Sequence, residues 1–478
     1  MHHRDHRPAP RRRLAAAALA SLALTGCASF SPDGGFGAVE QLAKERTGRA
    51  PALLRTAAQS DAAAARVAEL LQQPLSAGGA VEVALLNNRE LQAGYAELGI
   101  AEADLVRAGR LANPSFSFGR LSGHGVEIDR AVLFDVLGLL TMPLAREVEQ
   151  QRFEQAQLRA ADRTVAVAAA AREAFVTAVA ARQLVGFQQR VLETAEAASE
   201  LARRMAAAGN FSALAQLREQ SFHADATAQL ARAQHQAVVA REALVRVLGL
   251  GGDAQDLRLP ERLPELPAVA AEPRDAEQTA LDQRLDVRLA RREAEATARA
   301  LGLTQATRFV NVLHAGYQNQ SASGEPRRNG YEIELTLPLF DFGSARVARA
   351  EALYLQAVNR TAAVGVQARS EVRESYSAYR TAYELARLYR DEVVPLRKRI
   401  SDEQLLRYNG MLISVFELLA DAREQIAGVV GAVSSLRDYW IAESRLQTAL
   451  TGRSPAAAGA AGLSSTATMS SAAAAAGH

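Results

Sequence analysis

The sequence predicts a mainly α-helical fold with a small membrane β-barrel, in which long antiparallel coiled-coil hairpins adjoin four short strands per protomer. Three observations predict this fold class. Two segments of roughly sixty residues are dominated by strong helix formers. Four short segments alternate apolar and polar residues, as lipid-facing or half-buried strands do. The arrangement recurs along the chain with a period of about 195–200 residues, which indicates two copies of one structural unit.

The chain begins with the features of a secretory leader. A basic stretch ends at Arg13 and precedes eleven apolar or small residues, 14–24, too few to span a bilayer. We therefore interpret residues 1–26 as a signal peptide. Residues 24–27, Leu-Thr-Gly-Cys, resemble the bacterial lipobox, so Cys27 is expected to carry a covalent lipid inserted in the outer membrane. The alternative is an ordinary signal peptide followed by a stray cysteine.

An internal repeat sets the predicted domain organisation. Residues 141–144 (TMPL) match residues 336–339 (TLPL), and residues 218–220 (REQ) recur at 423–425. The predicted segments are an N-terminal anchor segment (27–79), a first structural repeat (80–250), a proline-rich linker (251–274), a second structural repeat (275–452) and a disordered Ala/Ser/Gly tail (453–478).

Each repeat contains a very long helix and a return helix. No proline intervenes between Pro143 and residue 208, and at 1.5 Å per residue this segment gives a rod of about 100 Å. Residues 344–408 have a similar length and are interrupted only by Gly365 and Pro395. Return helices at 212–248 and 414–450 complete two antiparallel hairpins. After Cys27, no apolar run is expected to cross a membrane as a helix.

The strands are predicted in pairs at the ends of these rods. Residues 331–337 alternate strictly, with Leu335 on an apolar face and Glu334 on a polar one, the pattern of an outer-membrane barrel strand. An antiparallel sheet on a soluble protein is the alternative. The other predicted strands are 114–121, 126–134 and 309–318.

Four strands cannot close a membrane barrel, because the smallest such barrels have eight. Strands that cross lipid must therefore be completed by other protomers, since open edges are not tolerated there. Two copies supply eight strands and fill the interior with side chains, whereas three supply twelve and leave a lumen. Long rods and a lipid anchor are better matched by the arrangement that leaves a lumen.

Charge and residue inventory exclude several functions. Without the five arginines and one aspartate of the leader, the 55 basic and 53 acidic residues become 50 and 52, so phosphate-driven nucleic-acid binding is not expected. One cysteine excludes a disulfide framework or a cysteine zinc site. His223 and His235 are twelve residues apart, and after the leader no histidine pair has the i,i+4 spacing of a metal site. We expect no enzymatic activity, no metal and no cofactor besides the lipid on Cys27.

Both repeats resemble the TolC-like outer-membrane efflux proteins, in their lipoprotein branch. The markers are residues 337–343 (LPLFDFG) and residues 408–419 (YNGMLISVFELL), and the resemblance covers nearly the whole mature chain. It implies a trimer whose twelve-stranded barrel continues into a periplasmic α-helical tunnel. The implied partners are a periplasmic adaptor protein and an inner-membrane pump of the resistance-nodulation-division type.

The resemblance also assigns candidate site residues. The hairpin tips expected to contact the adaptor are Gly209, Asn210, Asn409 and Gly410. Glu417 and Asp421 lie four residues apart, hence on one helical face. Acids just beyond the second tip line the closed end of the tunnel in this family; Glu417 matches such a position, and Asp421 is offset by about one residue. In a trimer each would form a ring of three carboxylates, which favours cations. The alternative is a solvated helix face.

The leading hypothesis is a passive exit duct of a tripartite efflux system. One alternative is the outer-membrane duct of a type I protein secretion system. A second alternative is a periplasmic coiled-coil lipoprotein without a pore. The sequence does not identify the cargo, because such a duct receives what the pump delivers.

Overall fold

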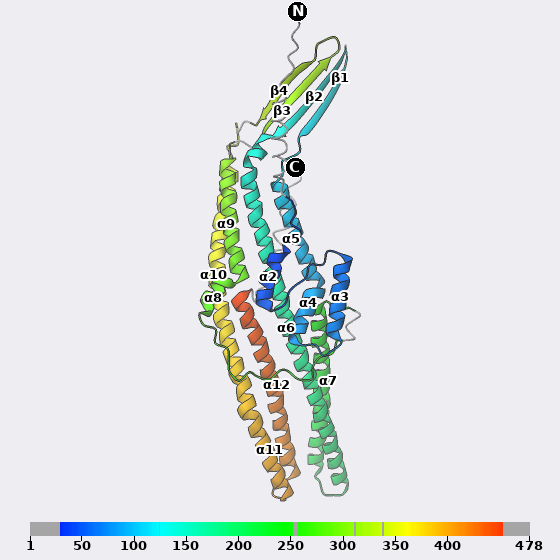
Figure 1. Cartoon of the computed structure of the whole chain (residues 1–478). Coiled ribbons are helices and arrows are strands. Elements are labelled where there is room, and N and C mark those ends of the chain that lie inside the picture. Colours follow the sequence, from blue (N-terminus) through cyan, green and yellow to red (C-terminus); the bar gives the residue numbers. More distant parts are fainter. Residues whose placement is uncertain (1–28, 124, 252–256, 310–311, 337–338, 453–478) are drawn as a thin grey trace, which may run out of the picture. The chain divides into compact units, whose positions relative to one another are not determined.

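The computed structural model describes residues 29–123, 125–251, 257–309, 312–336 and 339–452. The predicted signal peptide, Cys27 and the predicted tail lie outside the described residues. The described chain is mainly helical and contains one four-stranded antiparallel sheet (Figure 1). The predicted fold class is therefore confirmed for the protomer.

The elements follow one another in the same order in the two predicted repeats. Before and within the first repeat they are α2 (Phe36–Thr47), α3 (Ala57–Leu71), α4 (Ala77–Asn87), α5 (Arg89–Ala108), β1 (Ser115–Ser122), β2 (Val126–Asp135), α6 (Val136–Ala207) and α7 (Ala213–Leu248). The second repeat contains α8 (Ala276–Gln283), α9 (Leu285–Ala306), β3 (Leu313–Ala322), β4 (Arg328–Leu335), α10 (Ser344–Leu388), the π-helix η2 (Tyr389–Val393), α11 (Val394–Asn409) and α12 (Val415–Thr451).

The chain also divides into two compact units, whose boundaries do not coincide with those of the predicted repeats. Among the described residues, one unit contains 29–37, 96–158 and 289–362, which include the sheet. The other contains 38–95, 159–288 and 363–452, which include both hairpin tips. Each unit thus draws on both halves of the sequence.

The sheet has the order β1-β2-β3-β4, so the two predicted strand pairs are joined by β2 and β3. The first pair lies within a residue of its predicted bounds. The second pair is shifted: β3 begins at Leu313 rather than 309, and β4 begins at Arg328 rather than 331. The turn between them contains Gly324, whose φ of +83° is readily adopted only by glycine.

The first long helix begins earlier than predicted. α6 starts at Val136 because Asp135 accepts a hydrogen bond from the Gly138 N–H (2.7 Å) and caps the helix directly after β2. Pro143 therefore lies inside the helix instead of at its start. The expectation that no apolar run is long enough to cross a membrane was too strict for α6. One stretch of it is long and apolar enough, but 56% of that stretch is buried within the protein, as in an ordinary core helix.

The second long helix is interrupted once among its described residues, at η2. Gly365 lies inside α10 without breaking it, so that part of the prediction was wrong. Pro395 does disturb the helix: it has no N–H, and its ring clashes with the carbonyl four residues earlier. The preceding turn widens into η2, in which the Val394 N–H donates to Tyr389 O. Within η2, the hydrogen bond from Arg390 lowers the pKa of Asp391.

The return helices begin where the sequence predicts, since Ser212 and Ser414 cap them through their hydroxyls. The two preceding turns share one hydrogen-bond pattern but place different residues in the left-handed region. In the first turn this residue is Gly209, with a φ of +77°. In the second it is Met411, with a φ of +56°, and not the neighbouring Gly410. A non-glycine residue in this conformation costs roughly 1–2 kcal/mol.

The predicted linker packs as an ordered strap. We use this name for residues 257–273. Its leucines Leu257, Leu259, Leu263 and Leu266 are buried. Arg182 of α6 donates to Leu259 O, and Trp440 of α12 donates to Pro264 O (3.1 Å). The strap therefore connects the first hairpin (α6 from residue 159, with α7) to the second hairpin (α10 from residue 363, η2, α11 and α12).

Candidate functional site

The strand register gives one face of the sheet apolar rows at the end near the helices and a polar row, which includes Arg130 and Asn319, nearer the hairpin turns. Phe116, Val132, Tyr317 and Tyr331 pair in one continuous row across all four strands, so their side chains share a face. Leu335 pairs with Leu313 on the same face. Three members of this row are exposed: Phe116 (66%), Tyr317 (54%) and Tyr331 (85%). An apolar surface of this kind marks a contact with lipid or with another protein.

The opposite face of the sheet is polar and acidic. Its rows pair Glu127 with Ala322, and His314 with Glu334 at 3.1 Å between Nδ1 and Oε2. The acids on this face are Glu127, Asp129, Asp135, Glu332 and Glu334. β1 and β4 each keep one unpaired edge among the described residues, so this sheet is open. The predicted faces of Leu335 and Glu334 agree with the register.

All four predicted tip residues, Gly209, Asn210, Asn409 and Gly410, are exposed. The sequence prediction did not include Met411 and Leu412, which are 94% and 77% exposed at the second tip. The sequence could have indicated this apolar surface, because both are large apolar residues inside a turn. Their exposure gives this tip an apolar surface.

Glu417 has a structural role that the sequence prediction omitted. It is the third residue of α12, and its Oε2 accepts from the Ser414 N–H at 2.9 Å, while the Ser414 hydroxyl accepts from the Glu417 N–H. This reciprocal pair is a capping box. Glu417 is exposed, so the carboxylate caps the helix and also faces outward from the protomer.

Asp421 lies in a different environment from Glu417. It is only 9% exposed, and its Oδ2 atom is buried without a hydrogen-bond partner among the described residues. A buried carboxylate oxygen without a partner is costly, so a water, an ion or a neighbouring chain is expected to satisfy it. The two acids that the sequence placed on one helical face thus differ in burial.

A charged contact between the hairpins was also missed. The Arg423 guanidinium lies 3.2 Å from Glu219 Oε1 and stacks 4.4 Å from the centre of the Phe222 ring. Glu219 is almost fully buried, at 2% exposure. Ile426 of α12 packs on Val191, Ala195 and Ala226 of the first hairpin. We call Glu219, Phe222, Arg423 and Ile426 the inter-hairpin contact.

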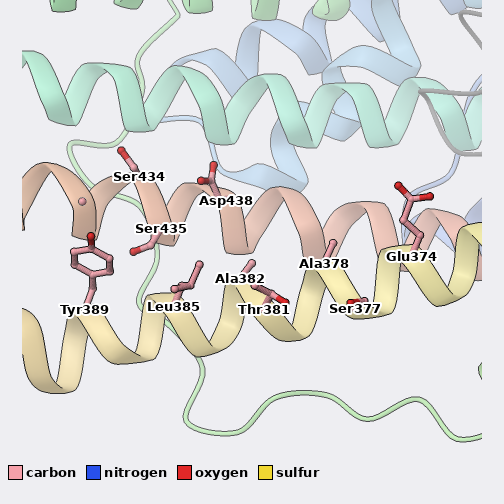
Figure 2. Close-up of a pocket in the computed structure, with 11 residues that line it drawn as sticks. Glu374, Ser377, Ala378, Thr381, Ala382, Leu385, Tyr389, Ser434, Ser435 and Asp438 are labelled. Atoms are coloured by element: carbon pink, nitrogen blue, oxygen red, sulfur yellow. The ribbon is translucent and has the colours of Figure 1, made fainter.

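A pocket of about 700 Å³ lies between α10 and α12 of the second hairpin. Figure 2 shows Tyr389 and Leu385 pointing toward α12, from which Ser435 points back toward them. Its walls are mostly small or polar side chains. Among the residues that the structure describes, no group of three or more histidine, cysteine or acidic side chains could hold a metal ion. The pocket is a loosely filled region of the coiled coil next to η2.

The fold is similar to that of solved outer-membrane channels. A membrane protein from Pseudomonas aeruginosa has a TM-score of 0.68 and 20% identity, covering 81% of this chain and 93% of its own. The outer membrane protein VceC from Vibrio cholerae has a TM-score of 0.64 and 18% identity, with 79% and 96% covered. The open state of the MtrE outer membrane channel of Neisseria gonorrhoeae has a TM-score of 0.64 and 17% identity, with 78% and 88% covered.

These similarities define the class by fold: the chain has the fold of an outer-membrane channel protein. The resemblance to TolC-like outer-membrane efflux proteins is confirmed at that level. The similar structures are channels rather than enzymes. No protein-family model matches the sequence, and no curated protein sequence matches it either.

Proposed function

We propose that this protein is the outer-membrane duct of a tripartite efflux system and passively conducts substrates delivered by an inner-membrane pump. The observation that carries the proposal is the sheet, with an apolar row across four strands and an acidic opposite face. In a membrane barrel the apolar face contacts lipid, and the polar face lines a hydrated lumen. The fold of the similar channels supports this arrangement.

The duct requires three protomers. In lipid, the unpaired edges of β1 and β4 need partners, and these edges can pair between neighbouring copies. Three copies then give a twelve-stranded barrel with a lumen. Light scattering in mild detergent, corrected for bound detergent, should give the mass of a homotrimer. A folded, monodisperse monomer would contradict the shared barrel.

The exposed tips support a periplasmic partner. Met411 and Leu412 offer apolar surface at the second tip, and Gly209 and Asn210 are exposed at the first. We propose that these tips contact the adaptor protein, which connects the duct to a pump of the resistance-nodulation-division type. The cargo depends on that pump.

We propose that Glu417 and Asp421 form the narrow, cation-binding end of the tunnel. The test must remove charge without removing the capping box, so Glu417→Gln is preferred to alanine, because glutamine also serves at this capping position. Glu417→Gln with Asp421→Asn should weaken the block of single-channel conductance by a trivalent cation added on the periplasmic side, because fewer carboxylates bind it.

The matched control for this charge removal is Glu261→Gln, which neutralises an exposed acid in the strap. It should leave the block unchanged. If the trivalent cation blocks the conductance of wild type, double variant and control equally, the two acids do not bind it and lie on a solvated helix face.

We propose that Cys27 carries the lipid that anchors the mature chain. Cys27→Ser should abolish acylation and leave a larger, unprocessed precursor, because the thioether cannot form. The barrel should still insert, because its apolar face contacts the membrane independently of the lipid. The measurement is metabolic labelling with a fatty acid together with the apparent mass; normal labelling and processing in the variant would refute the lipobox.

A further inference from the structure

The first hairpin contains a cavity near its tip, which we call the first-tip cavity. It has a volume of about 260 Å³, and its wall consists mainly of apolar side chains of α6 together with Phe211 of the turn. Further from the tip the space between α6 and α7 is filled by large side chains, among them Val191 and Phe222. At the cavity, α6 presents Ala198 and Ala202 instead. The short side chains of these alanines leave the space unfilled.

Glu219 of α7 lines the first-tip cavity and is the one charged member of its wall. Every other buried residue of α7 is apolar. Glu219 is only 2% exposed, so its carboxylate is removed from bulk solvent. Its Oε1 lies 3.2 Å from Arg423 Nη2, whereas its Oε2 is buried and has no hydrogen-bond partner among the described residues. One oxygen of this carboxylate therefore lacks the hydrogen bond that a buried polar atom needs.

The first-tip cavity is poorly suited to a water molecule as the missing partner. A buried water usually makes about three hydrogen bonds to polar groups. Among the residues that line the cavity, only Thr194 and Glu219 carry a side-chain oxygen or nitrogen, and the Thr194 hydroxyl already donates to Arg190 O at 2.9 Å. The partner that fits such a site is a single hydrogen-bond donor attached to an apolar group.

The equivalent acid of the second repeat has a different environment. Residues 218–220 match residues 423–425, so Glu424 corresponds to Glu219. The Glu424 side chain is 62% exposed and pairs with Arg397 at 2.8 Å. Its charge is therefore both hydrated and paired. The buried, half-paired carboxylate is a property of the first hairpin, and Glu424 provides a matched control for it.

We propose that the first-tip cavity binds a small lipophilic ammonium ion. Its apolar body fills the space beside Leu201, Met205 and Phe211, and its N–H donates to Glu219 Oε2. An ammonium group is favoured over a neutral donor, because opposite charges attract strongly where water is excluded. The volume is smaller than the ~300 Å³ at which drug-sized sites begin, so the ligand is limited to one ring or a short alkyl chain. Arg423 keeps its place on Oε1.

The test uses a short alkylammonium that carries a photoactivatable diazirine. It is added to the full-length protein in nanodiscs of zwitterionic lipid, and the labelled peptides are mapped by mass spectrometry. The alcohol with the same carbon skeleton serves as the neutral probe. The ammonium should label the segment 194–219 about tenfold more strongly than the alcohol does, because only the ammonium pairs its charge with the carboxylate.

Three variants separate the charge from the space. Glu219→Gln keeps the size of the side chain and should lower labelling of this segment by the ammonium about tenfold, to the level of the alcohol. Glu424→Gln should label like the wild type. Ala198→Leu should abolish labelling of the segment by both probes, because leucine fills the cavity. Far-UV circular dichroism and light scattering establish that each variant is folded and assembled like the wild type.

Three results would overturn the site: labelling by the ammonium that persists in Glu219→Gln or Ala198→Leu, equal labelling of the wild type by the two probes, or no labelling of the segment 194–219. Labelling does not require conduction, so the outcome is independent of the proposed duct.

Discussion

Replacing Arg284 with leucine is expected to lower the free energy of unfolding by about 3–5 kcal/mol, since two partly buried carboxylates lose their counter-charge. Arg284 is 0% exposed. Its Nη2 atom lies 2.7 Å from Asp286 Oδ2 and 2.7 Å from Glu371 Oε2, and its Nη1 donates to Ala449 O. One side chain thus ties α9 to α10 and to the end of α12. The measurement is equilibrium urea unfolding in mild detergent, followed by circular dichroism.

Two further variants separate this effect from a general loss of charge. Arg380→Leu removes a more exposed arginine that pairs with Glu272 at 3.0 Å, and should cost no more than about 1 kcal/mol. A triple replacement of Arg284, Asp286 and Glu371 by leucine should recover most of the loss, because no buried charge is left unpaired. A single Arg284→Leu variant as stable as Arg380→Leu would show that the network contributes little.

Arginine at Leu335 is expected to impair assembly far more than arginine at Glu334, its neighbour on β4. The register places Leu335 on the apolar face beside Leu313 and Glu334 on the polar face beside His314. A charge on the lipid face costs about 2–4 kcal/mol per protomer near the bilayer midplane, whereas a lumen position stays hydrated. The measurement is the free energy of folding into lipid vesicles for the two variants. Equal losses, or a larger loss at Glu334, would refute the assignment of the faces.

Features set by neighbouring residues could be predicted from the sequence. Period-two alternation predicted which face of β4 is apolar, and Ser212 and Ser414 marked the starts of the return helices. The capping box was also readable as Ser-x-x-Glu, and it gives Glu417 a local role beside the proposed one.

Features that depend on distant contacts could not be predicted. Glu219 and Arg423 lie 204 residues apart, and nothing local indicates that they meet. The prolines of the linker predicted a break but not that it would pack along both hairpins. Pro395 predicted an interruption, but not that a widened turn would keep both flanks helical.

Single-channel recording of the purified protein in a planar bilayer is the most direct test of whether it forms a conducting duct. The acidic face of the sheet, which we assign to the lumen, predicts discrete conductance steps with a reversal potential that favours cations. Replacing Glu332 and Glu334 with glutamine should reduce that preference while the steps remain. A folded, membrane-inserted protein that gives no conductance steps would show that it does not form a duct.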